Sequence, residues 1–298
     1  MAAVPRLCLR CGGPSRRAFV ATDRNRCVSD RRFEYLCCDV CGVIWMADVP
    51  DDLGGLYPSD YHTAMAPADL AAAIVAEAPR LRLLTRHVSP GRLVEIGPSR
   101  GVFAAAAKAA GFDVTALELD PECCRHLELN VGVRAINTAT PETVLPTLPR
   151  SRAVVAWHVI EHVPDPWGLL RVIAARLEPG GVLALATPNP GSLQFRLFGA
   201  RWLHADTPRH LTLIPLAALR DEAAGHGLEL IGTTTTDPVG LALNEAGWQR
   251  SFLRPPAQRQ EVRFAWTIGR VLATLLGPVE RRGLHGAAYT ALFRRNGG

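Results

Sequence analysis

The stretch Leu93–Gly111, LVEIGPSRGVFAAAAKAAG, decides the fold of this chain. Its opening residues, 93–96, are typical of a short buried strand, and Gly97 begins a turn that ends at Gly101. The alanine-rich segment that follows has the composition of a helix. A strand, a glycine turn and a helix in this order form the first unit of a parallel sheet that helices cover on both faces.

The same alternation of strands and helices continues to residue 236. Besides 93–96, we predict strands at 112–118, 132–136, 152–157, 182–186 and 228–236. Helices are predicted at 64–88, 101–110, from Pro121, from Asp165 to about 178, and at 214–226. We therefore expect an α/β fold with a doubly wound, mostly parallel, seven-stranded Rossmann-like sheet.

The cysteines and two proline-rich breaks suggest how the chain is divided. Six of its eight cysteines lie between Cys8 and Cys41. We predict a zinc-ribbon-like module at 1–60, the Rossmann-like domain at 61–237, a helical cap insert at 238–286 and the last strand of the main sheet at 287–298. With 298 residues, of which 48% are hydrophobic, the chain can bury a sizeable core.

Two cysteine pairs carry the spacing of zinc ligands. Cys8 and Cys11 form one CxxC pair and Cys38 and Cys41 form another, and a glycine follows each pair. Paired thiolates at this spacing bind Zn²⁺ tetrahedrally, and four of them leave no open position, so the ion is expected to be structural. Cys37 is an alternative ligand with the wrong spacing, and four buried or redox-active thiols are the alternative interpretation.

Charge and hydropathy favour a cytoplasmic protein that does not bind nucleic acid. The net charge is +5, but Lys108 is the single lysine and the arginines are scattered rather than clustered. No apolar stretch is long enough to predict a membrane span, and arginine and cysteine come too early for a signal peptide.

The glycine turn departs from the dinucleotide-binding pattern. Glu95 precedes Gly97, and a carboxylate there would repel a pyrophosphate but attract a cation. Glu118 ends the second predicted strand, where a carboxylate accepts hydrogen bonds from both ribose hydroxyls. A nucleoside that carries positive charge fits both features, which indicates S-adenosylmethionine.

Residues 90–236 resemble a class I S-adenosylmethionine-dependent methyltransferase, in the branch of the ubiquinone-biosynthesis O-methyltransferases and small-molecule methyltransferases. The matching pieces are VEIGPSRG at 94–101, VTALELDPE at 114–122, HVIEHVPDP at 158–166, LEPGGVLALATPN at 177–189 and DTPRHLTLIPLAAL at 206–219. The cysteine pairs that precede this domain also resemble those of sugar C-methyltransferases.

The resemblance implies a set of cofactor-binding residues. Glu95, Gly97 and Gly101 would line the methionine end, with Ser99 in place of a glycine that the family usually has. Glu118 would bind the ribose. The segment 137–139, with Thr138 at its centre, would flank the adenine, and His158 would lie beside the sulfonium.

Histidines near the same edge of the sheet are candidate bases. A hydroxyl acceptor must lose its proton, and histidine suits that task near neutral pH. The candidates are His158, His162 and His210, with His204 nearby; His162 and His210 could instead tie their loops to the backbone. Some relatives hold a divalent metal with an acid followed by Glu-His, but His158 stands in the acid position here, which disfavours that metal.

The remaining features concern access to the site. Tyr57 and Tyr61 could close over the cofactor or simply pack. The apolar positions of residues 248–279 follow helical spacing, which favours a cap over the substrate pocket and leaves a peripheral membrane or lipid contact as the alternative.

The leading hypothesis is methylation of a small molecule, with a hydroxyl of a sugar, lipid or secondary metabolite as the acceptor. The alternatives are an RNA or protein methyltransferase that uses the zinc module for recognition, a methyltransferase-like binding protein without activity, and a nicotinamide oxidoreductase. The pattern around Glu95 disfavours the last of these.

Overall fold

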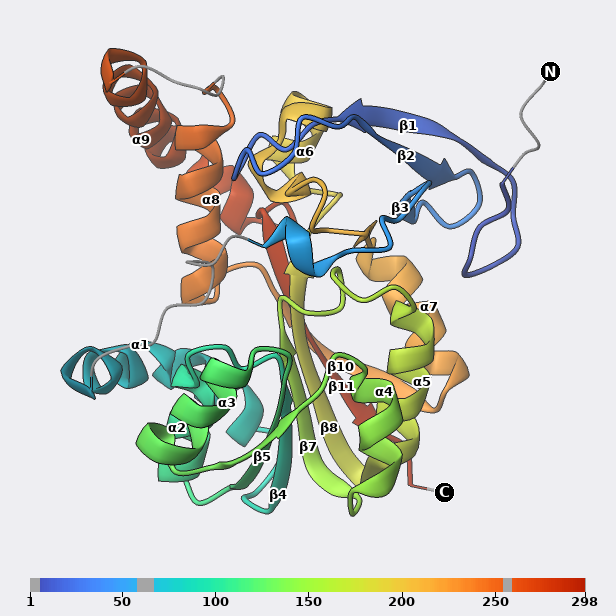
Figure 1. Cartoon of the computed structure of the whole chain (residues 1–298), viewed down its shortest axis with the longest axis vertical. Helices are drawn as coiled ribbons and strands as arrows, with labels where there is room; N and C mark the ends of the chain where they lie inside the picture. Colours follow the sequence, from blue (N-terminus) through green and yellow to red (C-terminus); the bar gives the residue numbers. More distant parts are fainter. Residues whose placement is uncertain (1–5, 58–66, 254–258, 298) are drawn as a thin grey trace.

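The computed structural model describes residues 6–57, 67–253 and 259–297, which form two β-sheets flanked by helices (Figure 1). The larger sheet has seven strands in the order β10-β11-β8-β7-β4-β5-β6. Its strands are β4 (Arg92–Ile96), β5 (Asp113–Glu118), β6 (Arg134–Asn137), β7 (Ser151–Trp157), β8 (Leu177–Pro188), β10 (Leu228–Thr234) and β11 (Ala288–Arg295). Strand β11 runs antiparallel to both its neighbours, β8 and β10, so the predicted mostly parallel sheet is confirmed.

Helices cover both faces of this sheet because successive residues of its central strands point to opposite sides. Leu93 and Val155 pack into one core with the first two helices, whereas Val94 and Val154 pack into another core with the fifth and seventh. The helices are α1 (Pro67–Thr85), α2 (Val102–Ala109), α3 (Pro121–His126), α4 (Pro141–Val144), α5 (Pro166–Arg176), α6 (Leu193–Phe198) and α7 (Leu216–Gly225).

The four-stranded N-terminal sheet lies over the carboxyl ends of the parallel strands (Figure 1). It consists of β1 (Ser15–Ala21), β2 (Phe33–Cys38), β3 (Ile44–Met46) and β9 (Thr212–Leu213), the last of which follows β8 in the chain. Tyr35 and Met46 pack with Trp202 and Leu213 in one core. A module of residues 1–60 remains a prediction, and its sheet is completed by a strand from the main domain.

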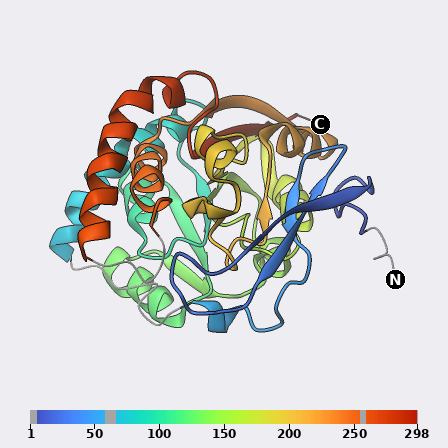
Figure 2. The ribbon, with the colours of Figure 1, turned by 90° about the horizontal axis from the view of Figure 1, so that it is seen from above.

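Two helices separate β10 from β11. They are α8 (Pro238–Arg250) and α9 (Arg259–Arg281), and they lie on the opposite side of the molecule from β1 and β2 (Figure 2). The predicted break between them, at residues 255 and 256, lies outside the described residues. The outer surface of α9 exposes Phe264, Val271 and Leu275, so the alternative of a lipid contact stays a prediction.

No helix in the described part of the chain is long and apolar enough to cross a bilayer.

The turn after β4 requires glycine at its last residue, Gly101. Gly101 has a φ of +70°, and a Cβ there would lie 2.6 Å from Leu127 Cδ2 and 3.0 Å from Val131 Cγ2. Both side chains are buried against the start of α2. A larger residue would therefore adopt a disfavoured backbone conformation and also push these side chains out of position.

We expect Gly101→Ala to destabilise the protein by about 3 kcal/mol, because the backbone strain adds to the clash. Gly180→Ala is the matched control: Gly180 has a φ of +75° with nothing within 4 Å of an added Cβ, so only the strain of about 1 kcal/mol applies. Urea denaturation of both variants measures the difference. An equal loss of stability in the two variants would show that the clash with Leu127 adds nothing to the backbone strain.

Candidate functional site

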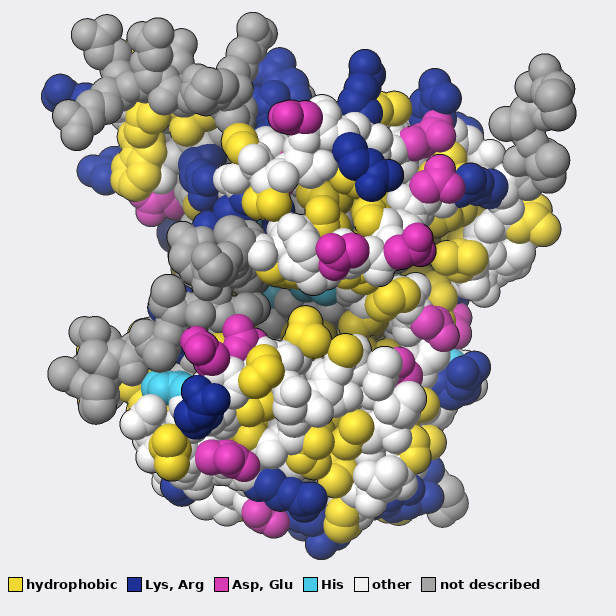
Figure 3. Space-filling model, in the orientation of Figure 1, with side chains coloured by type: hydrophobic (Ala, Val, Ile, Leu, Met, Phe, Trp, Pro, Cys, Tyr) yellow, Lys and Arg dark blue, Asp and Glu magenta, His cyan; other side chains and the backbone are white. Residues whose placement is uncertain are grey.

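The candidate site lies where the carboxyl ends of β4, β5 and β7 meet, beneath the N-terminal sheet. Figure 3 shows the molecule hollowed at this level, with histidine surface inside the hollow. In open parallel sheets ligands bind at this edge, because the loops that follow neighbouring strands converge there.

Glu118 joins two of these loops. Its carboxylate accepts hydrogen bonds from the backbone N–H of Ser99 at 2.8 Å and of Asp120 at 2.9 Å. Ser99 has a φ of +49°, the left-handed region that its glycine-type position in the turn requires. A carboxylate has about four lone-pair sites, so Glu118 can accept ribose hydroxyls as well.

The loop predicted to flank the adenine lies directly beside Glu118. Thr138 donates its backbone N–H to the carbonyl of Glu118 at 2.8 Å, and the Asn137 side chain donates to the same carbonyl at 3.0 Å. The structure therefore brings Ser99, Glu118 and Thr138 together, as expected from the motifs.

Glu95 is a buried carboxyl without a full set of partners. It is 2% exposed, and its Oε2 accepts no hydrogen bond from the described residues. Burial, and after it the charges of Glu77 and Glu118, raise the pKa of Glu95 to about 8, although Arg80 opposes them. A bound cation would relieve this, since it favours the ionised form.

Arg80, on α1, is a site residue that the motif analysis missed. Its Nε donates to Asp237 Oδ1 at 3.1 Å, and its guanidinium lies 4.6 Å from the centre of the Trp157 ring. Nη2 is buried and finds no acceptor among the described residues. The charge of Arg80 also acts on Glu95, and Arg80 itself pairs with Glu77 at 3.7 Å as well as with Asp237. The site thus offers a carboxyl and a guanidinium, which suit a zwitterionic amino acid.

His158 and Glu161 lie side by side at the end of β7. His158 has a φ of +57°, and its Nδ1 lies 3.4 Å from Glu161 Oε1. Burial by itself would raise the pKa of Glu161, but the neighbouring His158 lowers it to about 2. Glu161 is completely buried, whereas 23% of the His158 side chain is exposed. The Nε2 atom of His158 is itself buried and finds no partner among the described residues.

His162 is held by its surroundings in the neutral form. Its Nδ1 lies 3.0 Å from the Arg209 carbonyl and 3.0 Å from the Tyr57 hydroxyl. Burial, and after it the charge of His210, lowers the pKa of His162 to about 4. Tyr57 thus contacts a candidate base, while Tyr61 lies outside the described residues.

His210 also has a backbone partner, because its Nδ1 lies 2.9 Å from the carbonyl of His204. Its ring stands 4.6 Å from that of His162. The ligand atoms of Glu161, His162 and His210 all lie within 4.8 Å of one another, so these three residues could hold a metal ion. The sequence did not bring these three together as one set.

The four predicted zinc ligands converge in the structure. The Sγ atoms of Cys8, Cys11, Cys38 and Cys41 lie within 4.8 Å of one another. The backbone N–H groups of Val40 and Cys41 point to Cys38 Sγ at 3.4 Å, which stabilises a thiolate. Four sulfur ligands in one cluster suit a structural Zn²⁺.

Cys37 is not part of this cluster. Its thiol points to the backbone carbonyls of Cys38 and Gly42 instead.

One guanidinium connects the N-terminal sheet to the histidines. Arg209 binds Asp23, in the loop after β1, at 2.7 Å and Asp206 at 2.8 Å, and it is 1% exposed. It also donates to the carbonyl of Leu56 at 3.2 Å. Because the Arg209 carbonyl in turn lies against His162, this ion network fixes that ring.

Comparison with known proteins identifies the family. A model of the methyltransferase domain matches residues 69–233, more than half of the chain. The chain belongs to the methyltransferase domain family. The order of the strands in the large sheet agrees with this family. The resemblance to class I methyltransferases that was drawn from the sequence is confirmed.

Curated relatives match the central part of this methyltransferase. A ubiquinone biosynthesis O-methyltransferase of Xanthomonas campestris is 33% identical over 133 residues, which cover 42% of this chain and 55% of the relative. One from Bordetella avium is 31% identical over 125 residues, which cover 40% of this chain and 52% of the relative. The chain thus spans about half the length of the curated relatives it matches.

A solved structure supports the fold alone. The SAM-dependent methyltransferase from Archaeoglobus fulgidus is 16% identical, with a TM-score of 0.51 over 75% of this chain and 94% of that protein.

We expect Cys38→Ser to release zinc and to destabilise the N-terminal sheet, because a hydroxyl is a poor ligand for Zn²⁺. Cys37→Ser is the matched control, since its thiol lies outside the cluster. Metal analysis of the purified proteins measures the zinc content: about one ion per chain for the wild type and the control, and a clear loss in Cys38→Ser. A wild type without zinc, or equal losses in both variants, would contradict the assignment.

Proposed function

We propose that this chain transfers a methyl group from S-adenosylmethionine to a small-molecule acceptor, with a hydroxyl of a sugar, lipid or secondary metabolite as the favoured target. The buried and partly unpartnered carboxyl of Glu95 is the observation that carries this proposal. An uncompensated buried carboxyl is costly, and a cationic ligand offsets that cost.

The residues at this edge fit each part of the donor. Glu95 would attract its positive charges and Arg80 would bind its methionine carboxylate. Glu118 would accept the ribose hydroxyls, with Thr138 beside the adenine. The bound donor supplies a methyl group on a sulfonium that is already activated, so the protein must align the acceptor and exclude water.

Among the three histidines, His158 is the favoured base. Its side chain is partly exposed, and the ionised Glu161 beside it stabilises the imidazolium that forms when His158 takes a proton. The low pKa of His162, about 4, makes that residue a weak base. His210 remains the alternative base, and its contact with the His204 carbonyl also suits a positioning role.

A divalent metal, if one binds, would be held by Glu161, His162 and His210. It would polarise a hydroxyl of the acceptor and lower its pKa. The two carboxylate oxygens of Glu161 have no geometrically satisfactory hydrogen-bond donor among the described residues, which fits a cation at this position.

The ubiquinone O-methyltransferases it resembles support a small-molecule acceptor, and nothing in the fold favours an RNA or protein acceptor over it. A cytoplasmic location remains a prediction.

Glu95 should release a proton when the donor binds. With a pKa of about 8 it is mostly protonated at pH 7, and the cation favours the ionised form. Calorimetry in buffers of different ionisation enthalpy should show release of close to one proton at pH 7 and almost none at pH 9.5. Glu95→Gln should release none and bind S-adenosylmethionine at least tenfold more weakly.

Glu95 also makes the stability of the ligand-free protein depend on pH. An unfolded glutamate titrates near 4.5, so the folded state binds more protons between pH 4.5 and 8 and loses stability as the pH rises. The Glu95→Gln variant should lose less stability than the wild type over this pH range. A wild type that binds the donor without releasing protons would contradict the role of Glu95.

Replacement of His158 by alanine should lower turnover at least 100-fold, because a general base contributes about 10²–10⁴-fold. The affinity for S-adenosylmethionine should stay within about threefold. His226→Ala is the matched control, because His226 caps the C-terminal end of α7 and pairs with Glu222. Transfer of labelled methyl into the small-molecule fraction of a cell extract measures turnover, with and without a chelator.

Unchanged turnover in His158→Ala would exclude His158 as the base. Loss of turnover in a chelated wild type that keeps the zinc of its cysteine cluster would assign the proton-removing role to a metal held by Glu161, His162 and His210.

A further inference from the structure

The outer side of α9 is an exposed apolar surface. Its large apolar side chains are between 47% and 69% exposed, and they are Phe264, Val271, Leu275 and Val279. They are spaced seven, four and four residues apart, which places them along one side of the helix. Figure 2 shows α9 along the outer edge of the molecule, and the exposed fractions show that none of the described elements covers this apolar line.

Another side of α9 is packed tightly against α8. Gly269 lies so close that an added Cβ would be 2.4 Å from Gln249 Cα. Glu280 is 1% exposed and accepts hydrogen bonds from Gln194 at 2.8 Å and from Trp248 at 3.0 Å. These contacts fix the rotation of α9 about its own axis, so the apolar line stays on the outside.

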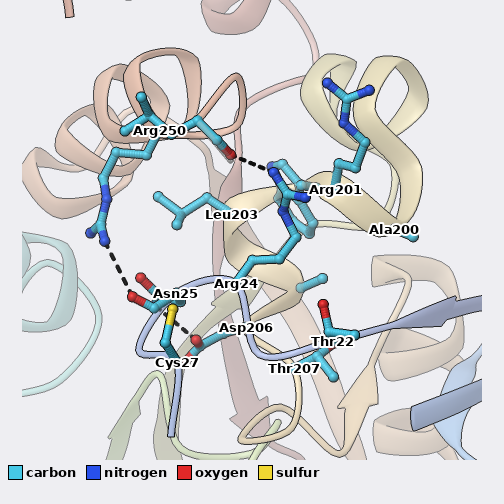
Figure 4. A pocket seen from close by; sticks show the side chains of 13 residues that line it. Thr22, Arg24, Asn25, Cys27, Ala200, Arg201, Leu203, Asp206, Thr207 and Arg250 are labelled. Atoms are coloured by element: carbon cyan, nitrogen blue, oxygen red, sulfur yellow. Dashed lines mark hydrogen bonds between the residues drawn. The ribbon is translucent and has the colours of Figure 1, made fainter. Parts of the chain in front are cut away.

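The far end of α8 is fixed as well. Arg250, in its last turn, donates to the carbonyl of Asn25 at 3.5 Å. Arg24, in the loop after β1, donates in the opposite direction to the carbonyl of Leu253 (Figure 4). The hairpin of α8 and α9 is thereby attached to the N-terminal sheet, and α9 presents its apolar line from a fixed base.

Arginines accompany the apolar line. The exposed arginines of α9 share one side of the helix, and they are Arg263, Arg270 and Arg281. Arg270 Nε lies 3.9 Å from Glu245 Oε1, but both side chains are about half exposed or more, so this ion pair is weak. Of the two acids within α9, Glu280 is buried, and the side chain of Glu261 lies outside the described residues. Figure 3 shows hydrophobic surface on α9 with Lys and Arg surface beside it.

A groove of about 490 Å³ lies on the same outer side. Its described walls all come from α9, and they are Trp266, Thr267, Arg270, Val271, Thr274 and Leu275. Trp and Arg side chains join an apolar body to a polar tip, which suits the level of the headgroups in a bilayer. The groove therefore offers apolar contacts directly beside polar ones.

The charge of this surface distinguishes a membrane from a second copy of the chain. Two α9 helices packed face to face would bring their arginines close together, and like charges repel. The surface of an anionic bilayer attracts the same arginines. A helix with an apolar side and arginines beside it lies in the plane of such a surface, with its apolar side chains among the acyl chains.

We propose that α9 docks this protein on the surface of an anionic lipid bilayer. The apolar line enters the boundary between headgroups and acyl chains, and Arg263, Arg270 and Arg281 meet the lipid phosphates. The proposal goes beyond the methyltransferase function and does not depend on it, because vesicle binding can be measured without any methyl transfer.

Cosedimentation with lipid vesicles tests the proposal. At low ionic strength the wild type should bind vesicles of phosphatidylcholine mixed with phosphatidylglycerol about tenfold more tightly than vesicles of phosphatidylcholine alone. L275S should weaken binding to the mixed vesicles about fivefold, because it removes an apolar side chain from the inserted line. L129S is the matched control: Leu129 is 75% exposed on the segment Leu127–Val131, and its loss should leave binding unchanged.

The arginines are tested separately. R263Q combined with R270Q should weaken binding to the mixed vesicles about tenfold or more, since both charges lie at the proposed lipid surface. R220Q is the matched control, because it removes the same charge from the exposed pair of Arg220 and Asp221 on α7. All four variants change exposed residues, so their thermal unfolding and their binding of S-adenosylhomocysteine should match the wild type.

A wild type that fails to bind the mixed vesicles, or that binds neutral vesicles equally well, would overturn the proposal. Equal weakening in L129S or R220Q would overturn it too. Light scattering supplies a further test: a dimer in solution that L275S dissociates would assign this face to a second copy of the chain. Vesicle binding by a protein that fails to bind S-adenosylhomocysteine would instead count against the methyltransferase function alone.

Discussion

The buried guanidinium of Arg209 is the interaction on which the architecture of the site depends. It holds Asp23 from the N-terminal sheet and Asp206 from the main domain, at 2.7 and 2.8 Å, and none of the three side chains is more than 8% exposed. A buried charge is tolerated only when it is well paired, so removing the guanidinium would leave two buried carboxylates without their shared cation. The N-terminal sheet is thereby fixed over the ends of the parallel strands, and the loops that carry His162 and His210 are fixed with it.

The ligand-facing side of the site follows a different principle. There some polar atoms are left without partners among the described residues. Glu95 is buried with Oε2 unpartnered, and Arg80, although paired with Glu77 and Asp237, is buried with Nη2 unpartnered. Buried polar groups without partners reduce stability, and they persist where a ligand completes them. The contrast between the fully paired Arg209 and the partly paired Glu95 distinguishes residues that hold the fold together from those that we expect to meet the donor.

Much of the fold could be predicted because it is carried by local patterns. The turn after β4, the position of Glu118 and the two cysteine pairs are short motifs in which a few residue types imply a geometry, and the structure brings their members together. The residues missed by sequence reasoning act through contacts far apart in the chain. Arg80 reaches Asp237, and β9 completes a sheet whose other three strands lie near the N-terminus, so neither has a signature in its own neighbourhood.

The most direct test of the account is a crystal structure of the protein with S-adenosylhomocysteine. The account predicts the ribose hydroxyls on the Glu118 carboxylate, the amino-acid end between Glu95 and Arg80, and the sulfur facing the end of β7 near His158. An empty crevice in crystals soaked with this ligand, or the ligand bound elsewhere on the molecule, would contradict it.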